Sequence, residues 1–261
     1  MTRKINTPIL VTGGTGTIGR LTVPLLVAAG RTVRILSRGG RPENIAPDPR
    51  VEYVQADLLA DGELDPALVG GAETVLHLAG GPKGDDAATA RLVRAARAAG
   101  TVKHLILVSV VGADAMPIGY FRAKAGAERA VMESGIGWTV LRAAQVNELL
   151  LKMVGAIRRM PLVPAPGGLR FQPVDAAKVA ARLAELTLGD PAGRVSDLAG
   201  PGVYTLPQLA AAQRVAAGAK PRRTLPIRLP GKVGRAYRAG ANLTGDDALI
   251  AGRDWKEFLA A

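Results

Sequence analysis

The chain has 261 residues, 48% hydrophobic and 21% charged, which suffices for one large core or a core with a smaller appendage. It has no cysteine, which excludes disulfides and thiol chemistry, and its two histidines, His77 and His104, lie far apart, so no metal site is expected. The net charge of +12 suggests a polyanionic partner, but the basic residues are scattered and aromatic residues make up 3%, too few for stacking on bases.

A basic surface that attracts a small anion is therefore favoured over a nucleic-acid interface. No run of eighteen or more apolar residues is present, which predicts no membrane span. The first six residues lead directly into an apolar run of strand length, unlike a secretory leader. We expect a cytoplasmic protein, a monomer or homodimer, that acts on a small molecule without a membrane partner.

Short apolar runs alternate with amphipathic stretches over the first half, the βαβ pattern of a parallel, doubly wound sheet. The first strand is expected at Ile9–Thr12, followed by a helix over residues 17–29 that contains Pro24 and ends at Gly30. Further strands are expected at Val33–Ser37, 51–56, 74–79, 105–109 and 138–141, and helices at 87–99 and 122–134. Because these strands are almost wholly apolar, helices should cover both faces of the sheet.

After residue 142 this alternation breaks down. We expect a helix over 145–160, a stiff proline- and glycine-rich loop over 161–168, a helix from Asp175 as N-cap to residue 186, a helix after the capping-box pair Thr205 and Gln208, and an edge strand within 221–230. The predicted fold class is thus α/β: a Rossmann-type doubly wound parallel sheet over 1–143, interleaved with a small C-terminal substrate-binding portion over 144–261.

The most specific motif is the glycine-rich turn at residues 11–19, VTGGTGTIG, which follows the first strand and opens a helix. Gly13 permits the tight turn, Gly16 leaves room for a diphosphate at the helix N-terminus, and Gly19 allows the helix to pack closely on the strand. A turn that binds no ligand is the alternative. The motif predicts a dinucleotide site formed by Gly13, Thr15, Gly16, Thr17, Ile18 and Gly19.

The end of the second strand indicates which dinucleotide is bound. Sites that prefer NAD usually carry an acid there, which holds the ribose 2′-hydroxyl. This chain instead has Ser37 and Arg38, with Arg41 nearby, and a guanidinium matches the geometry of a 2′-phosphate. Although these arginines could simply be solvated, the pattern favours NADP(H).

The turn at residues 12–19, together with Tyr120-Phe121-Arg122-Ala123-Lys124, resembles the short-chain dehydrogenase/reductase superfamily, and more narrowly its atypical, NmrA-like NAD(P)H-binding branch. Supporting segments are 54–58, 75–80, 124–128, 138–142, 229–232 and 239–242. The resemblance implies that Asp57 and Leu58 lie near the adenine. It also implies that Ala79 and Gly80 lie along the nicotinamide side.

Three residues are candidates for catalysis. Tyr120 and Lys124 are four residues apart, so on a helix they project from one face, where an ammonium favours the phenolate and eases proton transfer. Lys124 can also hold the nicotinamide ribose, and Ser109, at the end of a strand, can donate a hydrogen bond to a substrate oxygen. The alternatives are that the Tyr120 ring packs in the core and that Lys124 is a surface lysine. The resemblance implies catalytic roles, because family members use a serine, a tyrosine and a lysine in catalysis.

These residues predict an NADPH-dependent oxidoreductase that reduces a small apolar carbonyl or quinone-like substrate, with Tyr120 as proton donor. The apolar segment 146–162 favours such a substrate, and Gln145, Asn147, Met153 and Phe171 are candidates either to line its pocket or to pack in the core. The alternative function is a non-catalytic, NADP(H)-sensing regulatory protein of the NmrA-like type. A weaker third hypothesis, nucleic-acid binding, rests on charge alone.

Overall fold

The computed structural model of the chain describes residues 7–157 and 160–261. These residues form two compact units that alternate along the sequence. The first unit contains the described residues up to Ser109, then Ala123–Leu141 and Ala180–Val195. The second unit contains Val110–Arg122, Arg142–Val179 and Ser196–Ala261.

The first unit is built on a mostly parallel sheet. Its main strands are β1 (Ile9–Thr12), β2 (Val33–Ser37), β3 (Val51–Gln55), β4 (Thr74–His77), β5 (His104–Val110) and β6 (Gly137–Ala143). They are ordered β6-β5-β4-β1-β2-β3, and the short strand β9 (Gly193–Arg194) pairs with β6. Strand β1 lies between β4 and β2, in register with both, so the order reverses direction beside it. Crevices for ligands form at such a reversal.

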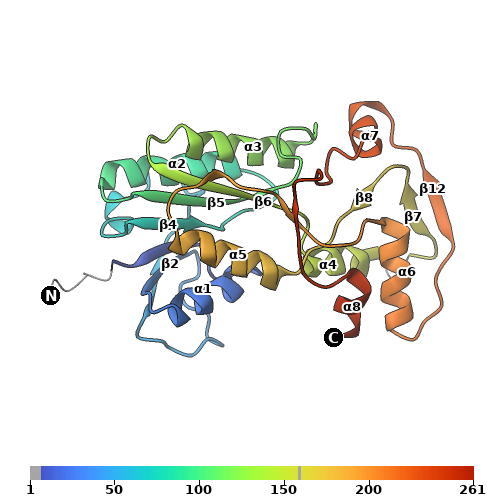
Figure 1. Cartoon of the computed structure of the whole chain (residues 1–261), viewed down its shortest axis with the longest axis horizontal. Coiled ribbons are helices and arrows are strands. Elements are labelled where there is room, and N and C mark those ends of the chain that lie inside the picture. The colour runs from blue at the N-terminus through green and yellow to red at the C-terminus, as the bar shows by residue number, and fades with distance from the viewer. Residues whose placement is uncertain (1–6, 158–159) are drawn as a thin grey trace. The chain divides into compact units, whose positions relative to one another are not determined.

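Helices cover both faces of this sheet. They are α1 (Gly19–Ala28), α2 (Asp85–Ala99), α3 (Gly119–Met132) and α5 (Ala176–Leu188), with a short 3-10 helix, η1, at Pro66–Leu68. Figure 1 shows α2 and α3 on one face and α1 and α5 on the other. The Rossmann-type α/β fold predicted from the sequence is therefore confirmed.

The core of the first unit follows from this double cover. Ile9, Leu10 and Val11 of β1 are completely buried, as are Val75 and Leu76 of β4. Such strands have no face that meets water, which explains why the sequence reads as continuous apolar runs there.

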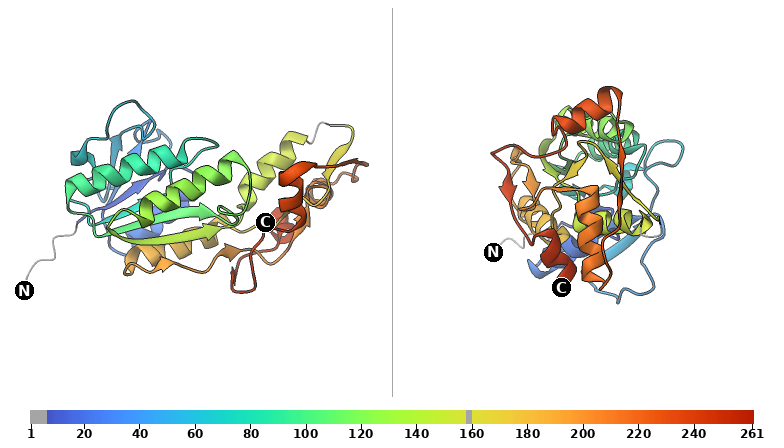
Figure 2. Two further views of the ribbon diagram at one scale, coloured as in Figure 1. Left: turned by 90° about the horizontal axis from the view of Figure 1, so that it is seen from above. Right: turned by 90° about the vertical axis from the view of Figure 1, so that its right-hand side faces the viewer.

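The second unit combines helices with short strands (Figure 2). Its elements are α4 (Asn147–Ile157), β7 (Val163–Pro166), β8 (Arg170–Phe171), β10 (Leu198–Ala199), β11 (Tyr204–Thr205), α6 (Leu206–Ala216), β12 (Thr224–Ile227), α7 (Gly231–Arg238), β13 (Leu249–Ile250) and α8 (Trp255–Ala260). Helix α6 packs against α4, α8 and β7. Trp255 is completely buried in this core, and its indole N–H donates to the Leu209 carbonyl at 3.2 Å.

The prediction of a loop at residues 161–168 is wrong, because this stretch contains β7, which pairs in parallel with β12. Val163 and Gly167 donate their N–H groups to the carbonyls of Arg223 and Ile227, each at 2.9 Å. The prolines at 164 and 166 fall between these donors, where the chain needs no N–H toward its partner. Proline therefore does not interrupt the pairing.

Other expectations for the second half are met in part. The edge strand expected within 221–230 is β12, and Thr205 and Gln208 form the predicted capping box of α6. The predicted helix over 145–160 is observed as α4, while residues 158–159 lie outside the described part of the chain. Helix α8 was not predicted, although Asp254 and Glu257 form the same capping-box signal at its start.

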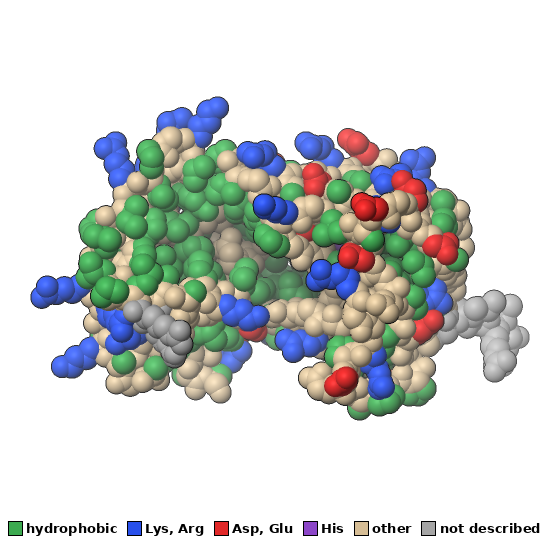
Figure 3. All heavy atoms as spheres, turned by 180° about the vertical axis from the view of Figure 1, so that it is seen from behind, with side chains coloured by type: hydrophobic (Ala, Val, Ile, Leu, Met, Phe, Trp, Pro, Cys, Tyr) green, Lys and Arg blue, Asp and Glu red, His purple; other side chains and the backbone are tan. Residues whose placement is uncertain are grey.

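Several large hydrophobic side chains of the second unit are exposed. Those on or near α4, β7 and β12 are Leu149, Met160, Leu162, Leu225 and Ile227, between 37% and 56% exposed. On the face drawn in Figure 3, hydrophobic side chains cover broad areas and Lys and Arg side chains project around them. In the described part of the chain, no helix has the length and apolar character needed to span a bilayer.

Candidate functional site

A cavity of about 820 Å³ lies within the first unit, at the carboxyl ends of its strands. Its walls come from the turn after β1, the segments that follow β2, β3 and β4, and the start of α2. The lining residues are Gly13, Thr15, Gly16, Leu36, Ser37, Arg38, Gly39, Gly40, Pro42, Ala56, Asp57, Leu58, Leu59, Leu78, Ala79, Gly80, Gly81, Pro82, Lys83, Asp85 and Ala88. The cavity is thus located where a doubly wound sheet reverses its strand order.

Most residues that the sequence assigned to a dinucleotide meet in this cavity. They are Gly13, Thr15, Gly16, Ser37, Arg38, Asp57, Leu58, Ala79 and Gly80. Thr17, Ile18 and Gly19 do not line it; they lead into α1. Most lining residues that were not predicted are sequence neighbours of predicted ones, whereas Asp85 carries a separate signal, as an acid that opens a helix after a glycine.

The glycine-rich turn is too tightly packed for side chains. Gly13 has φ +70°, and a Cβ there would lie 2.5 Å from the backbone nitrogen of Ala79. A Cβ on Gly19 would lie 2.3 Å from the carbonyl oxygen of Gly13. No side chain caps the N-terminus of α1 and no acid occupies its first turn, so its positive end remains available to an anion.

The segment after β2 presents a cation to the cavity. Arg38 is exposed, and its carbonyl oxygen is fixed by a hydrogen bond from Gln55 Nε2 at 2.9 Å. In the described lining the acids are Asp57, which follows β3, and Asp85 in α2, so none directly follows β2. Arg41 is not in the lining; its guanidinium donates to the Ile45 carbonyl at 3.2 Å.

A buried arginine holds the segment that follows β3. Arg91, on α2, is 7% exposed and donates to the carbonyl oxygens of Leu58 at 3.3 Å and Asp61 at 3.1 Å, and also to that of Ala60. Three carbonyls converging on one guanidinium fix the backbone on this side of the cavity. No pattern in the sequence indicated this role for Arg91.

A hydrogen-bonded chain runs beneath the segment that follows β4. Thr12 Oγ1 accepts from the Ala79 N–H at 3.2 Å and lies 2.6 Å from His77 Nδ1, and His77 Nε2 lies 2.9 Å from Thr89 Oγ1. Thr89 in turn donates to the Asp85 carbonyl at 2.6 Å. Burial, together with the positive charge of Lys124, lowers the pKa of His77 to about 3. His77 is therefore a neutral strand residue whose ring nitrogens face Thr12 and Thr89.

Lys124, on α3, forms a buried ion pair. Its Nζ lies 2.8 Å from Asp85 Oδ2, and the two side chains are 9% and 6% exposed. Lys124 does not line the cavity, but its neighbour Gly80 does. A Cβ added to Gly80 would lie 2.9 Å from the Lys124 ammonium. The surface-lysine alternative is therefore wrong for this residue.

The other catalytic candidates are placed by α3 and β5. Tyr120 is half-buried, four residues before Lys124 on α3, and its ring meets that of Phe121 edge-on at 5.3 Å between centroids. Ser109, on β5, is 5% exposed, and its Oγ has no hydrogen-bond partner among the described residues. Ser109 and Lys124 belong to the first unit and Tyr120 to the second.

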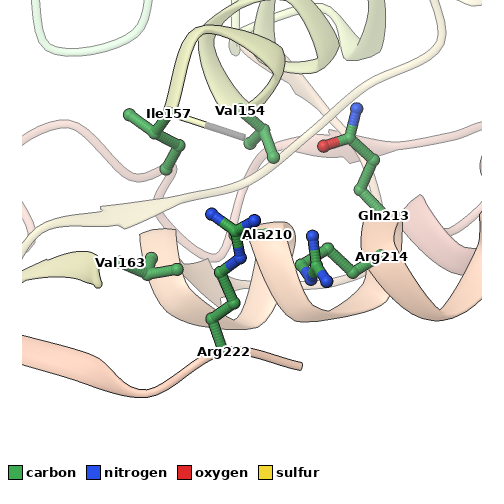
Figure 4. A pocket seen from close by; sticks show the side chains of 7 residues that line it. All are labelled: Val154, Ile157, Val163, Ala210, Gln213, Arg214 and Arg222. Atoms are coloured by element: carbon green, nitrogen blue, oxygen red, sulfur yellow. The ribbon is translucent and has the colours of Figure 1, made fainter. Parts of the chain in front are cut away.

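A second cavity, in the second unit, is lined by Val154, Ile157, Val163, Ala210, Gln213, Arg214 and Arg222 (Figure 4). Its volume of about 10 Å³ accommodates no more than a single water molecule, so it is not a substrate site. The two arginines hold backbone: Arg222 donates to the Met160 carbonyl, and Arg214 Nε donates to that of Lys220 at 2.7 Å.

Comparison with known proteins points to one family. A model of an NAD(P)H-binding family matches residues 13–185. Quinone oxidoreductase 2 of Escherichia coli (strain K12) is 30% identical over 209 residues, 78% of this chain and 72% of that protein. A (4-alkanoyl-5-oxo-2,5-dihydrofuran-3-yl)methyl phosphate reductase of Streptomyces griseus is 35% identical over 204 residues, 76% and 69% of the two chains. An NAD(P)H azoreductase of Xenophilus azovorans is 31% identical over 217 residues, which are 80% of this chain and 74% of that protein.

Solved structures bear on the fold. An NADPH-dependent quinone oxidoreductase from Escherichia coli, complexed with NADPH, superposes with a TM-score of 0.76 at 21% identity and covers 97% of this chain and 98% of that one. A nucleoside-diphosphate-sugar epimerase from Staphylococcus aureus gives the same TM-score at 19% identity, and the superposition covers 97% of this chain and 100% of that one.

Proposed function

The chain belongs to the NAD(P)H-binding family, and from this we propose that it is an NADPH-dependent oxidoreductase that reduces a small apolar carbonyl or quinone-like substrate, with Tyr120 as proton donor. One observation carries the proposal: the glycine-rich turn, the basic segment after β2 and the segment after β4 line a single cavity of about 820 Å³. Three relatives, one named an oxidoreductase and two named reductases, support the reaction class.

The residues of this cavity suit a phosphorylated dinucleotide. The turn at Gly13 and Gly16, beside the open N-terminus of α1, would hold the diphosphate, because backbone amides and the helix dipole attract anions. Ser37 and Arg38 would hold the 2′-phosphate. Ala79 and Gly80 would lie along the nicotinamide. When bound, NADPH supplies the hydride.

The proton comes from the chain in this proposal. The Tyr120 phenol donates it to the substrate oxygen, and Lys124, one turn further along α3, supplies positive charge that favours the phenolate left behind. Ser109 is buried with an unpartnered hydroxyl among the described residues, which leaves its O–H available to the substrate oxygen.

The apolar character of the second unit and the names of the relatives support this substrate class. Leu149, Leu225 and Ile227 are exposed at 56%, 49% and 38%, so apolar surface is available to a conjugated carbonyl or quinone. The residues named from the sequence contribute less: Phe171 and Met153 pack in the core of the second unit, and Asn147 is fully buried.

The test is a titration of the full chain with NADPH and NADH, monitored by nucleotide fluorescence, followed by NADPH-consumption assays with quinones, ketones and enones. We expect NADPH to bind more tightly than NADH and at least one quinone or conjugated carbonyl to be reduced. Binding without turnover of any of these substrates would favour the NADP(H)-sensing regulator, and no binding of either nucleotide would refute both functions.

A further inference from the structure

We propose that Asp85 is a positioning residue that holds the Lys124 ammonium against Gly80, at the side of the cavity assigned to the nicotinamide ribose. This inference rests on the proposed function, because it concerns how Lys124 serves a bound dinucleotide. Asp85 was not among the site residues predicted from the sequence.

The carboxylate is fixed on both of its oxygens. Oδ1 accepts the Gly81 N–H at 2.7 Å, and Oδ2 lies 2.8 Å from Lys124 Nζ. Thr89 donates to the Asp85 carbonyl at 2.6 Å, which ties the first turn of α2 to the hydrogen-bonded chain through His77. The position of the ammonium is therefore determined from α2 and from the segment after β4.

Burial makes this partnership necessary. A cation as enclosed as Lys124 requires a counter-ion, because an unpaired charge is strongly destabilised when it is removed from water. The flexible lysine side chain would otherwise have several directions in which to point. Asp85 selects one of them, beside the glycine that lines the cavity.

Because Gly80 has no side chain, it leaves room for the Lys124 ammonium and its Asp85 partner. A Cβ at this position would lie 2.9 Å from Lys124 Nζ and 3.2 Å from Asp85 Oδ2. Its φ is not in the left-handed region, so a substitution here would test space and not backbone strain. Because the nearest atom is the end of a flexible side chain, Gly80→Ala should displace the ammonium and leave the fold intact.

The experiment compares Asp85→Asn with Asp86→Asn. Both remove one negative charge from the first turn of α2, but Asp86 is exposed and lies outside the cavity lining. Asparagine at 85 can still accept the Gly81 N–H, yet it loses the charge that holds Lys124. We expect Asp85→Asn to raise the NADPH dissociation constant about tenfold or more, the scale of one charge-assisted hydrogen bond. Asp86→Asn should change it less than about twofold.

A double-mutant cycle separates positioning from simple loss of packing. If Asp85 acts through Lys124, Asp85→Asn should add less than about a twofold change in NADPH affinity to Lys124→Met, which alone should weaken binding about tenfold. Gly80→Ala should reproduce the weaker binding of NADPH with little change in melting temperature, and it keeps the test valid if Asp85→Asn folds poorly.

Equal effects of Asp85→Asn with and without Lys124 would overturn the inference, as would Asp85→Asn or Gly80→Ala variants that bind NADPH like the wild type. These outcomes leave the proposed function standing, provided the wild type binds and oxidises NADPH. A wild type that binds neither NADPH nor NADH would instead remove the proposed function, and this inference with it.

Discussion

Thr12 and His77 end neighbouring strands of the sheet, and their side chains meet there, with 2.6 Å between Thr12 Oγ1 and His77 Nδ1. Because Thr89 donates its proton to the Asp85 carbonyl, it must accept from His77 Nε2, which leaves Nδ1 to accept from Thr12. Every donor in this chain has an acceptor while the imidazole is neutral. A second proton on the ring would occupy the Nδ1 lone pair, so the Thr12 O–H would lose this acceptor.

This arrangement predicts how stability depends on pH. The pKa of His77 is about 3 in the folded protein and about 6.5 when unfolded, so the unfolded chain binds a proton first as pH falls. Stability from this residue is complete above about pH 6.5 and is lost progressively toward about pH 3. Between about pH 7.5 and pH 4.5, the wild type should lose about 2–3 kcal/mol more than His77→Gln in urea unfolding. Parallel pH profiles of the two proteins would contradict the assignment.

Selectivity between the two nicotinamide nucleotides should depend on Arg38. Arg38→Ala should raise the NADPH dissociation constant about tenfold or more and leave that of NADH nearly unchanged, because only NADPH carries the 2′-phosphate. Arg41→Ala is the matched control, since this exposed residue lies outside the cavity lining. Equal losses for NADPH and NADH in Arg38→Ala would reject the phosphate role.

Proton donation should depend on the phenol of Tyr120. Tyr120→Phe should keep NADPH affinity within about twofold and reduce turnover at least about a hundredfold, the range expected when a general acid is removed. Tyr53→Phe, a half-buried residue of β3, controls for loss of a phenol elsewhere. Steady-state kinetics with the best substrate provide the measurement, and undiminished turnover would exclude Tyr120 from the mechanism.

Stability of the second unit should depend on Asp175. Burial would raise the pKa of this carboxyl, but hydrogen bonds from Arg253 and Asn147 lower it overall. Its contribution is therefore present above the unfolded pKa of about 3.9 and is lost at lower pH. Asp175→Asn should reduce the unfolding free energy by about 2–3 kcal/mol at neutral pH, and the exposed Asp246→Asn by less than about 0.5 kcal/mol. Denaturant unfolding of both variants checks this, and equal effects would argue against a structural role for Asp175.

The close approach at Gly19 should be required for binding. An added Cβ would lie 2.3 Å from the Gly13 carbonyl, so Gly19→Ala must displace the turn, at a cost of about 1–3 kcal/mol in stability and with weaker NADPH binding. Gly155→Ala, on α4, is the control, because nothing lies within 4 Å of its added Cβ and alanine favours a helix. Thermal melts with and without NADPH distinguish the two variants, and an unchanged Gly19→Ala would contradict the packing argument.

The first unit could be predicted closely because its signals are local. Buried parallel strands gave continuous apolar runs, and the turn at Gly13, Gly16 and Gly19 lies between a strand and a helix, as its pattern required. The resemblance to the NmrA-like branch agrees with the match to an NAD(P)H-binding family. The roles of Tyr120, Lys124 and Ser109 stay predictions.

The rest depends on contacts between residues distant in sequence. Strand β7 forms because β12, about sixty residues later, supplies its hydrogen-bond partners, and prolines at 164 and 166 concealed this possibility. The partner of Lys124 could not be chosen from among the acids by spacing, since Asp85 lies on another helix. Likewise, Arg91 reveals its role through the three carbonyls that meet it.

The alternation of the two units along the chain has a consequence for synthesis. Ala180–Val195 completes the first unit, but it is synthesised only after α4, β7 and β8 of the second unit. On the ribosome, the sheet of the first unit therefore lacks most of α5 and all of β9 until residue 195 has left the exit tunnel. A protein truncated after β6 would lack part of its first unit. The first unit therefore cannot be produced as a contiguous N-terminal fragment.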